Sequence, residues 1–214
     1  EQLSIAGAGE KVRKLIEDHI FSTGVDPKIP PVDLLAADFK EKLNDHKSDR
    51  AKASEIETAI KHHIKIKLED DPEYYKSLSE KLESIIRKHE EKWEELVQLL
   101  MDFRGTIEEE REARAEELGL TETEFAFHGI LMAEVTQGKG VEAIDEEMHL
   151  KIKSVVQQLV SMMDEATEIV DFFQKWDEQR RVRRNIKRAI LEEFDDLDLV
   201  KPVTDRFMEL AEVK

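Results

Sequence analysis

The sequence contains no cysteine, which excludes disulfides, thiol catalysis and zinc–thiolate sites. Proline and glycine are scarce, with five and eight residues in 214, and only 6% of the residues are aromatic. No apolar run approaches the roughly 18 residues of a membrane-spanning helix, and no charged-then-apolar leader opens the printed chain. We therefore expect a cytoplasmic protein with no membrane partner. Because the first residue is Glu1 rather than methionine, we also expect a fragment of a longer protein.

Charged residues, in contrast, are abundant. They make up 39% of the chain, against 40% hydrophobic residues, and the net charge is −17. Such a composition is typical of long amphipathic helices. Disorder is the alternative for so charged a chain, and the regular spacing of apolar residues argues against it. The negative charge makes the whole chain a poor general binder of DNA, because phosphates attract clustered Lys and Arg.

Apolar residues recur at helical spacing along most of the chain. The pattern predicts one helix of about thirty residues from Tyr75 to Phe103, ending near Gly105 or running on to Gly119, and a second long helix from Ile144 to Phe173. Shorter helices are predicted near 10–20, 37–43, 48–64, 121–136, 177–194 and 203–213. Because no alternating β-branched run and no Asn-Gly hairpin occurs, we predict an all-α fold: an elongated helical bundle with two long antiparallel helices, shorter helices and no sheet.

A chain of this length can bury one sizeable core, so we predict a single helical domain. Its predicted sub-regions are an N-terminal helix with a proline-rich connector at 1–47, a helical hairpin at 48–119 and a second helical half at 120–214. In the connector "DPKIPPVDLL", each proline restricts the residue before it. A helix start is predicted where Asp71 can cap ahead of Pro72, and another where Thr121 and Glu124 can form a capping box.

Two adjacent histidines, His62 and His63, end the stretch "SDRAKASEIETAIKHHI". Neighbours on a helix point about 100° apart, whereas two ligands of one metal usually lie three or four residues apart. The pair therefore cannot easily share an ion. We expect His63 to pack beside the apolar face of the helix, which is formed by Ala53, Ile56, Ile60 and Ile64. We expect His62, with Lys61 and Lys65, to form a docking face toward solvent or a partner.

Glu146 and His149 form a Glu-x-x-His motif, which di-iron helical bundles use twice. The chain has no second copy, and Glu124 with His128, four residues apart, would need further ligands. A metal-binding helical-bundle enzyme is therefore the alternative function. "QGKGV" lacks the spacing of a phosphate-binding loop, and Glu90-Glu91-Lys92 falls inside a predicted helix instead of at a strand edge. We predict no catalytic residue and no metal site in this chain.

The stretch "RRVRRNIKR" places six positive charges in nine residues. These are Arg180, Arg181, Arg183, Arg184, Lys187 and Arg188. On a helix, Val182, Ile186 and Ala189 would fall on one side and the basic residues on the opposite arc. The planar fork of arginine suits carboxylates and phosphates. Two interpretations stay open: a solvated face that pairs with the chain's own carboxylates, or contact with DNA or an acidic partner surface.

Four stretches of the sequence together match the pattern of one known family. They are "KVRKLIEDHIFSTGVDPKIPPVDLLAADF", "SDRAKASEIETAIKHHI", "DPEYYKSLSEKLESII" and "DLVKPVTDRFMELA". Together they resemble the C-terminal helical region of type I restriction enzyme R subunits, the HsdR proteins. The resemblance covers most of residues 10–100 and about the last twenty; between about 105 and 175 it rests on order and helical character. Its specific part is Lys28-Ile29-Pro30-Pro31 followed by Ser48-Asp49-Arg50-Ala51, which a generic bundle has no reason to carry.

The resemblance implies a function without chemistry of its own. In that family the full R subunit has a nuclease domain and two motor domains that move DNA with ATP, and its helical C-terminal region attaches it to the methyltransferase core. The implied partners are the methyltransferase and specificity subunits, other domains of the same R subunit and, as an open alternative, DNA. The family's nuclease and motor motifs are absent from these residues, so no catalytic residue is carried over. ATP and Mg²⁺ are implied only for the missing domains.

Overall fold

The structure is a computed structural model that describes residues 34–36, 38–136 and 144–214. Helices occupy most of these ranges, and no strand occurs within them, which confirms the predicted all-α fold. The elements are α2 (Phe39–Asn44), α3 (Asp49–Lys67), α4 (Pro72–Lys88), α5 (Trp93–Leu118), α6 (Glu122–Thr136), α7 (Glu146–Thr167), the 3₁₀ helix η2 (Phe172–Gln174), α8 (Trp176–Phe194) and α9 (Leu197–Val213). None of the described helices is long and apolar enough to span a membrane. The predicted first helix, most of the proline-rich connector and the "QGKG" break lie outside the described residues.

The described chain divides into two compact units. The first unit contains residues up to Ile66 together with 78–107, and the second contains 67–77 together with 108–214. The chain therefore passes between the units three times: at the end of α3, within α4 and within α5. The predicted sub-regions 1–47, 48–119 and 120–214 stay a prediction.

In the first unit, α3 buries the face that its sequence predicts. Ile56, Ile60 and Ile64 are fully buried, and each contributes roughly 1.5–3 kcal/mol through loss of apolar surface from water. His63 is buried beside them, whereas His62 is exposed, as predicted.

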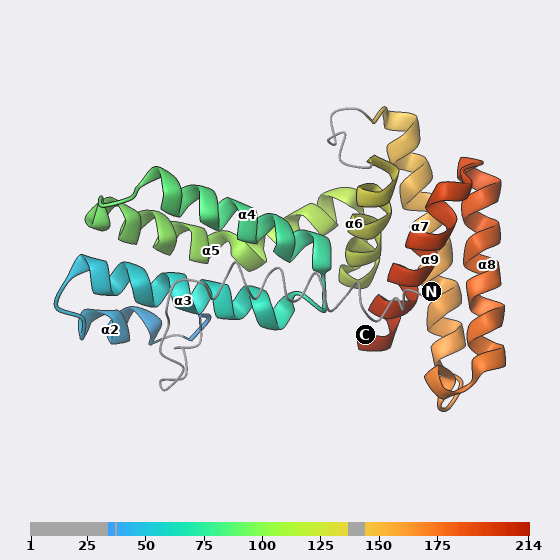
Figure 1. The fold of residues 1–214 in the computed structure, drawn as a ribbon, viewed down its shortest axis with the longest axis horizontal. Coiled ribbons are helices and arrows are strands. Elements are labelled where there is room, and N and C mark those ends of the chain that lie inside the picture. The colour runs from blue at the N-terminus through green and yellow to red at the C-terminus, as the bar shows by residue number, and fades with distance from the viewer. Residues whose placement is uncertain (1–33, 37, 137–143) are drawn as a thin grey trace, which may run out of the picture. The chain divides into compact units, whose positions relative to one another are not determined.

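Helix α5 contacts each of the other helices of the first unit, and Figure 1 shows α2, α3, α4 and α5 side by side. The Arg104 side chain donates to the Leu34 carbonyl oxygen at 2.5 Å, and its guanidinium lies 4.6 Å from the centre of the Phe39 ring in α2. The remaining contacts are Arg50 of α3 over Trp93, and Lys81 of α4 over Phe103. These cation–ring contacts add to the apolar packing of the unit.

The predicted single helix from Tyr75 to Phe103 is wrong at its centre. α4 ends at Lys88 and α5 begins at Trp93, so the two form a hairpin. In the connection, Glu91 has a φ of 68°, a left-handed conformation that non-glycine residues adopt rarely. Such a residue cannot continue an α-helix, and the chain reverses there.

The turn between α4 and α5 is held locally by His89. Its Nδ1 lies 2.9 Å from the carbonyl oxygen of Ile85, and its backbone N–H donates to Ile86. The apolar positions on both sides keep helical spacing through the turn, which is why the sequence predicted one helix. The overlooked signal is the run "KHEEK" at 88–92, which has no apolar residue to bury. Glu90-Glu91-Lys92 thus lies in a turn and not inside a helix.

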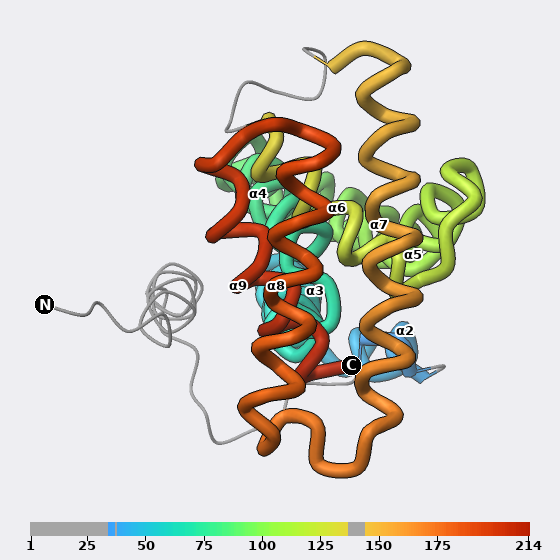
Figure 2. Tube along the Cα trace, turned by 90° about the vertical axis from the view of Figure 1, so that its right-hand side faces the viewer, coloured from blue at the N-terminus to red at the C-terminus, as the bar shows by residue number. Residues whose placement is uncertain are grey.

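In the second unit, α6, α7, α8 and α9 form a four-helix bundle. α6 packs on α7 and α9, and α8 packs on the same two helices. Figure 2 shows α7 turning into α8 at one end and α8 turning into α9 at the other, so these consecutive helices run antiparallel. Each helix supplies fully buried residues to the core, among them Ile130, Leu159, Ile186 and Phe207. The rings of Phe127 and Phe207 meet edge to face at 4.8 Å.

The end of α5 confirms the later of its two predicted stops. Gly119 has a φ of 61°, which glycine adopts without strain. The N–H of Leu120 donates to Ala115 and that of Gly119 donates to Glu116, each at 2.9 Å. These two bonds are those of a Schellman motif, which satisfies the last carbonyls of the helix.

Both predicted helix starts are present in the second unit. The Thr121 N–H donates to the Glu124 carboxylate at 2.7 Å, and the Glu124 N–H donates to the Thr121 hydroxyl at 3.2 Å, which completes the capping box. Asp71 accepts from the Tyr74 N–H at 3.3 Å, directly before the helix that begins at Pro72.

The predicted second long helix ends earlier than its apolar spacing suggested. α7 stops at Thr167, and Asp171 takes a left-handed φ of 57° before η2. Phe172 is nevertheless buried, because the 3₁₀ turn folds it back onto the bundle core. Apolar spacing therefore continued past the helix end, and the prediction that Phe173 belongs to the same helix is wrong.

Helix α9 begins at Leu197, earlier than the predicted start at Val203. Asp196 caps it by accepting from the Asp198 N–H at 2.8 Å. Pro202 lies inside the helix, where it removes one backbone bond near the first turn. The predicted start at Val203 was therefore six residues late, because the helix begins ahead of this proline and continues through it.

A buried ion pair anchors the start of α4 in the second unit. Arg111 of α5 donates from Nε to Asp71 at 3.0 Å and from Nη1 to Glu122 at 3.2 Å. Only 5% of Arg111 and 1% of Asp71 is exposed. The Tyr75 hydroxyl donates to Glu108 at 3.2 Å close by. Burial and the Glu108 carboxylate raise the pKa of Tyr75 above its usual range, which keeps this hydroxyl protonated as a donor.

Candidate functional site

Helix α8 separates apolar and basic side chains as its sequence predicts. Val182, Ile186 and Ala189 are buried in the bundle core. Among the six basic residues, Arg183 is half-buried toward α9 and the other five are exposed. We call these five residues the basic face: Arg180, Arg181, Arg184, Lys187 and Arg188.

Three of the six basic residues of α8 pair with carboxylates of the same chain. Arg183 contacts Asp205 of α9 at 2.8 Å, which ties the two helices together. Arg181 lies 3.2 Å from Glu178, and Arg188 lies 3.9 Å from Glu192, both within α8. Exposed pairs of this kind contribute little to stability. The interpretation as a self-paired face therefore accounts for only part of the cluster.

The other three basic residues of α8 have no carboxylate partner within the described ranges. Arg184 and Lys187 extend into solvent from the middle of the helix. The Arg180 guanidinium lies 5.1 Å from the centre of the Trp176 ring, an indole that is 67% exposed. Sequence reasoning missed Trp176; the available signal was its position outside the apolar spacing of Val182, Ile186 and Ala189.

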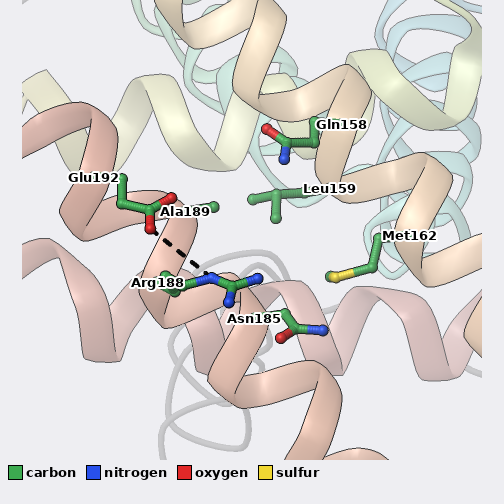
Figure 3. A pocket seen from close by; sticks show the side chains of 7 residues that line it. All are labelled: Gln158, Leu159, Met162, Asn185, Arg188, Ala189 and Glu192. Carbon is green, nitrogen blue, oxygen red and sulfur yellow. Dashed lines mark ion pairs between the residues drawn. The ribbon is translucent and has the colours of Figure 1, made fainter.

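A shallow hollow of about 250 Å³ lies between α7 and α8 beside the basic face. Figure 3 shows its lining, in which side chains of α7 face those of α8. Leu159, Met162 and Ala189 are apolar, and Gln158 and Asn185 provide amides next to Arg188. The carboxylate of Glu192 also lines the hollow, 3.9 Å from Arg188. No histidine, serine or threonine lines it, so the hollow offers amides and an ion pair for polar contacts, but no hydroxyl nucleophile and no imidazole base.

The predicted docking face on α3 is only partly open. His62 and Lys65 are exposed, as expected. Lys61 is not: its Nζ lies 2.6 Å from Glu57, and 14% of its side chain is exposed. Ile66, at the end of the same helix, is 59% exposed. Of the three residues of the predicted face, His62 and Lys65 are therefore exposed and Lys61 is largely covered.

The predicted metal candidates are not brought together as a site. Among the described residues, no group of three or more His, Asp and Glu is placed to hold a metal ion. The carboxylate of Glu124 is occupied by the capping box. His128 is buried on α6, where burial first, and then the positive charges of His149 and Lys153, lower its pKa to about 4. The positive charge of Lys153 disfavours a metal ion at this imidazole as it disfavours a proton.

Comparison with known proteins agrees with the family resemblance found in the sequence motifs. A family model described as "Type I restriction enzyme HindI endonuclease subunit-like, C-terminal" matches residues 9–213. A protein of Methanocaldococcus jannaschii, named as a type I restriction enzyme MjaIXP endonuclease subunit, is 26% identical over 156 residues. The match covers 69% of this chain and 14% of that protein, so the chain spans a small part of its relative's length. No solved structure matches the chain significantly. The family match confirms the resemblance predicted from the sequence.

Proposed function

Because this chain belongs to the family of C-terminal regions of type I restriction endonuclease subunits, we propose that it is a non-catalytic assembly module. Its role is to dock the nuclease and motor parts of the subunit onto the methyltransferase core of the complex. The family match over residues 9–213 is the observation that carries this proposal. Cleavage, translocation, ATP and Mg²⁺ would then belong to the rest of the longer subunit.

The surfaces of the two units support a docking role. The predicted α3 face, with His62, Lys65 and the exposed Ile66, combines charge with an apolar residue on one rigid helix. The basic face of α8 offers a second rigid surface of opposite charge to most of the chain. A specific interface of standard size buries about 800 Å² on each partner, an area that faces of helices of this length can supply.

Mixing the chain with the methyltransferase–specificity complex of its own system tests the proposal. We expect one co-eluting species in size-exclusion chromatography at micromolar concentrations. Two double variants then locate the interface: His62→Glu with Lys65→Glu on α3, and Arg184→Gln with Lys187→Gln on α8. These four side chains are exposed, so the variants remove no buried surface, and circular dichroism of each variant checks that it folds. Clean separation of the unaltered chain from the complex would contradict docking.

The non-catalytic part of the proposal has its own measurement. The isolated chain, incubated with ATP, Mg²⁺ and duplex DNA, should release no phosphate and cut no strand. If the homogeneous protein still hydrolysed ATP or cut DNA, the proposal that the chain is a non-catalytic assembly module would be wrong.

A further inference from the structure

We propose that the basic face of α8, together with the neighbouring polar surface of α7, binds the phosphate backbone of duplex DNA. This inference goes beyond docking onto the methyltransferase and does not depend on it. It rests on the distribution of charge, on the spacing of the cations and on the uncharged side chains around them.

The basic face is a local reversal of charge in an acidic unit. Within the described residues, the second unit carries 30 Asp and Glu side chains against 16 Lys and Arg, and five of the 16 form the basic face. No acidic residue occurs from Met148 to Met163 of α7 or from Gln179 to Leu191 of α8. These stretches belong to two helices that pack on each other. A polyanion repelled elsewhere would be attracted here.

The spacing of the cations suits a regular array of phosphates. Arg180 and Arg188 are eight residues apart, which is about 12 Å along a helix. Duplex DNA carries one phosphate per roughly 1.7 Å of its axis, so about seven phosphates lie within the same length. That count includes both strands, so about three or four phosphates of each strand lie within this length, a density comparable with that of the cations on the basic face.

The surroundings favour phosphate over an acidic protein surface. Gln158 and Asn185 place amide groups beside Arg188 in the hollow of Figure 3, where Glu192 is the one carboxylate and pairs loosely with Arg188 at 3.9 Å. Ser154 and Ser161 of α7 are exposed. Neutral donors of these types, with Arg and Lys, make most contacts to DNA phosphates. Protein interfaces instead centre on buried apolar or aromatic anchors. Between Arg180 and Arg188 the exposed face has none; Trp176 lies at its end.

Titration of a fluorescein-labelled duplex of about twenty base pairs with the full 214-residue chain, followed by anisotropy, tests the proposal. We expect binding at low salt that weakens steeply as salt rises. The double variant Arg184→Gln with Lys187→Gln should bind roughly ten-fold more weakly, with the slope of log K against log salt reduced by about two, since each lost phosphate contact removes about one. The matched control, Lys76→Gln with Arg114→Gln, removes two exposed charges elsewhere in the second unit and should leave binding near that of the unaltered chain.

Trp176 supplies a second, local readout. The chain has two tryptophans, so a Trp93→Phe variant leaves Trp176 as the sole indole, and its emission should change on addition of unlabelled duplex. The proposal would be overturned if the unaltered chain did not bind duplex DNA at low salt. It would also be overturned if the face variant and the control lost the same amount of DNA affinity. If the face variant loses only co-elution with the methyltransferase, the occupant is an acidic protein surface and DNA binding is refuted. Loss of co-elution in the α3 variant alone would leave this inference intact.

Discussion

The second unit uses arginine in two opposite ways. Arg111 and Arg206 are enclosed by carboxylates, Arg111 by Asp71 and Glu122, and Arg206 by Glu134 at 2.8 Å and by Glu73. The arginines of the basic face are exposed and paired weakly or not at all. The first two join helices that are distant in sequence, whereas the others leave their charge available to a partner. Burial and the number of carboxylates within reach, and not residue type, therefore separate a folding role from a binding role.

Removal of Arg111 should give the largest effect on stability. Arg111→Ala leaves the Asp71 carboxylate buried without its cation, and breaking a buried pair on one side costs about 3–5 kcal/mol. We expect the free energy of unfolding, measured by urea denaturation, to fall by an amount in that range. The double variant with Asp71→Asn should recover part of the loss, because no uncompensated charge then stays buried.

Arg114→Ala is the matched control on the same helix. Arg114 is exposed and lies 3.9 Å from Glu110, so its replacement should change the free energy of unfolding by less than about 0.5 kcal/mol. Equal losses for Arg111→Ala and Arg114→Ala would show that the comparison between buried and exposed arginines is wrong.

His128 extends the comparison to a buried basic group without a carboxylate. Its pKa is lowered to about 4 by burial and by the charges of His149 and Lys153, whereas an unfolded histidine titrates near 6.5. Between these values the unfolded chain binds the proton and the folded chain does not. Stability from this group is therefore complete above about pH 6.5 and is lost as pH falls toward 4, by up to about 3 kcal/mol.

Two measurements test the lowered pKa of His128 and its effect on stability. The NMR titration of the His128 imidazole should have a midpoint near pH 4. In His128→Leu, the difference in free energy of unfolding between pH 7 and pH 4 should be smaller than in the unaltered chain by up to about 3 kcal/mol. A midpoint near 6.5, or an unchanged difference, would exclude a buried neutral histidine at this position.

Local patterns predicted most of the helices because their causes are local. Apolar spacing predicted the buried face of Ile56, Ile60 and Ile64, and the Thr121–Glu124 capping box and the cap at Asp71 formed as expected. Each involves residues within a few turns of one another, where sequence separation translates directly into distance.

Some helix boundaries were predicted wrongly and some contacts between helices were missed. Both depend on tertiary structure, which the spacing of apolar residues does not reveal. Apolar spacing persists across the turn at Glu91 and past the end of α7, so it could not mark either boundary. The pair formed by Asp71 and Arg111 joins residues 40 positions apart, and that of Arg183 with Asp205 joins two helices. Which helices become neighbours decides such pairs. The composition of the basic face was predictable, but not which of its cations would stay without a partner.

Replacement of two cations in the basic face should have the smallest effect on stability. Arg184→Gln with Lys187→Gln removes no described ion pair and no buried surface. It also relieves repulsion among Arg180, Arg184 and Lys187, which stand four and three residues apart on the helix; like charges at this spacing cost about 0.2–0.5 kcal/mol. We therefore expect the free energy of unfolding to stay the same or rise by a few tenths of a kcal/mol in urea denaturation, most clearly at low salt because these charges are screened. A loss above about 1 kcal/mol would mean that these cations support the fold as Arg111 does, and the contrast between the two kinds of arginine would then disappear.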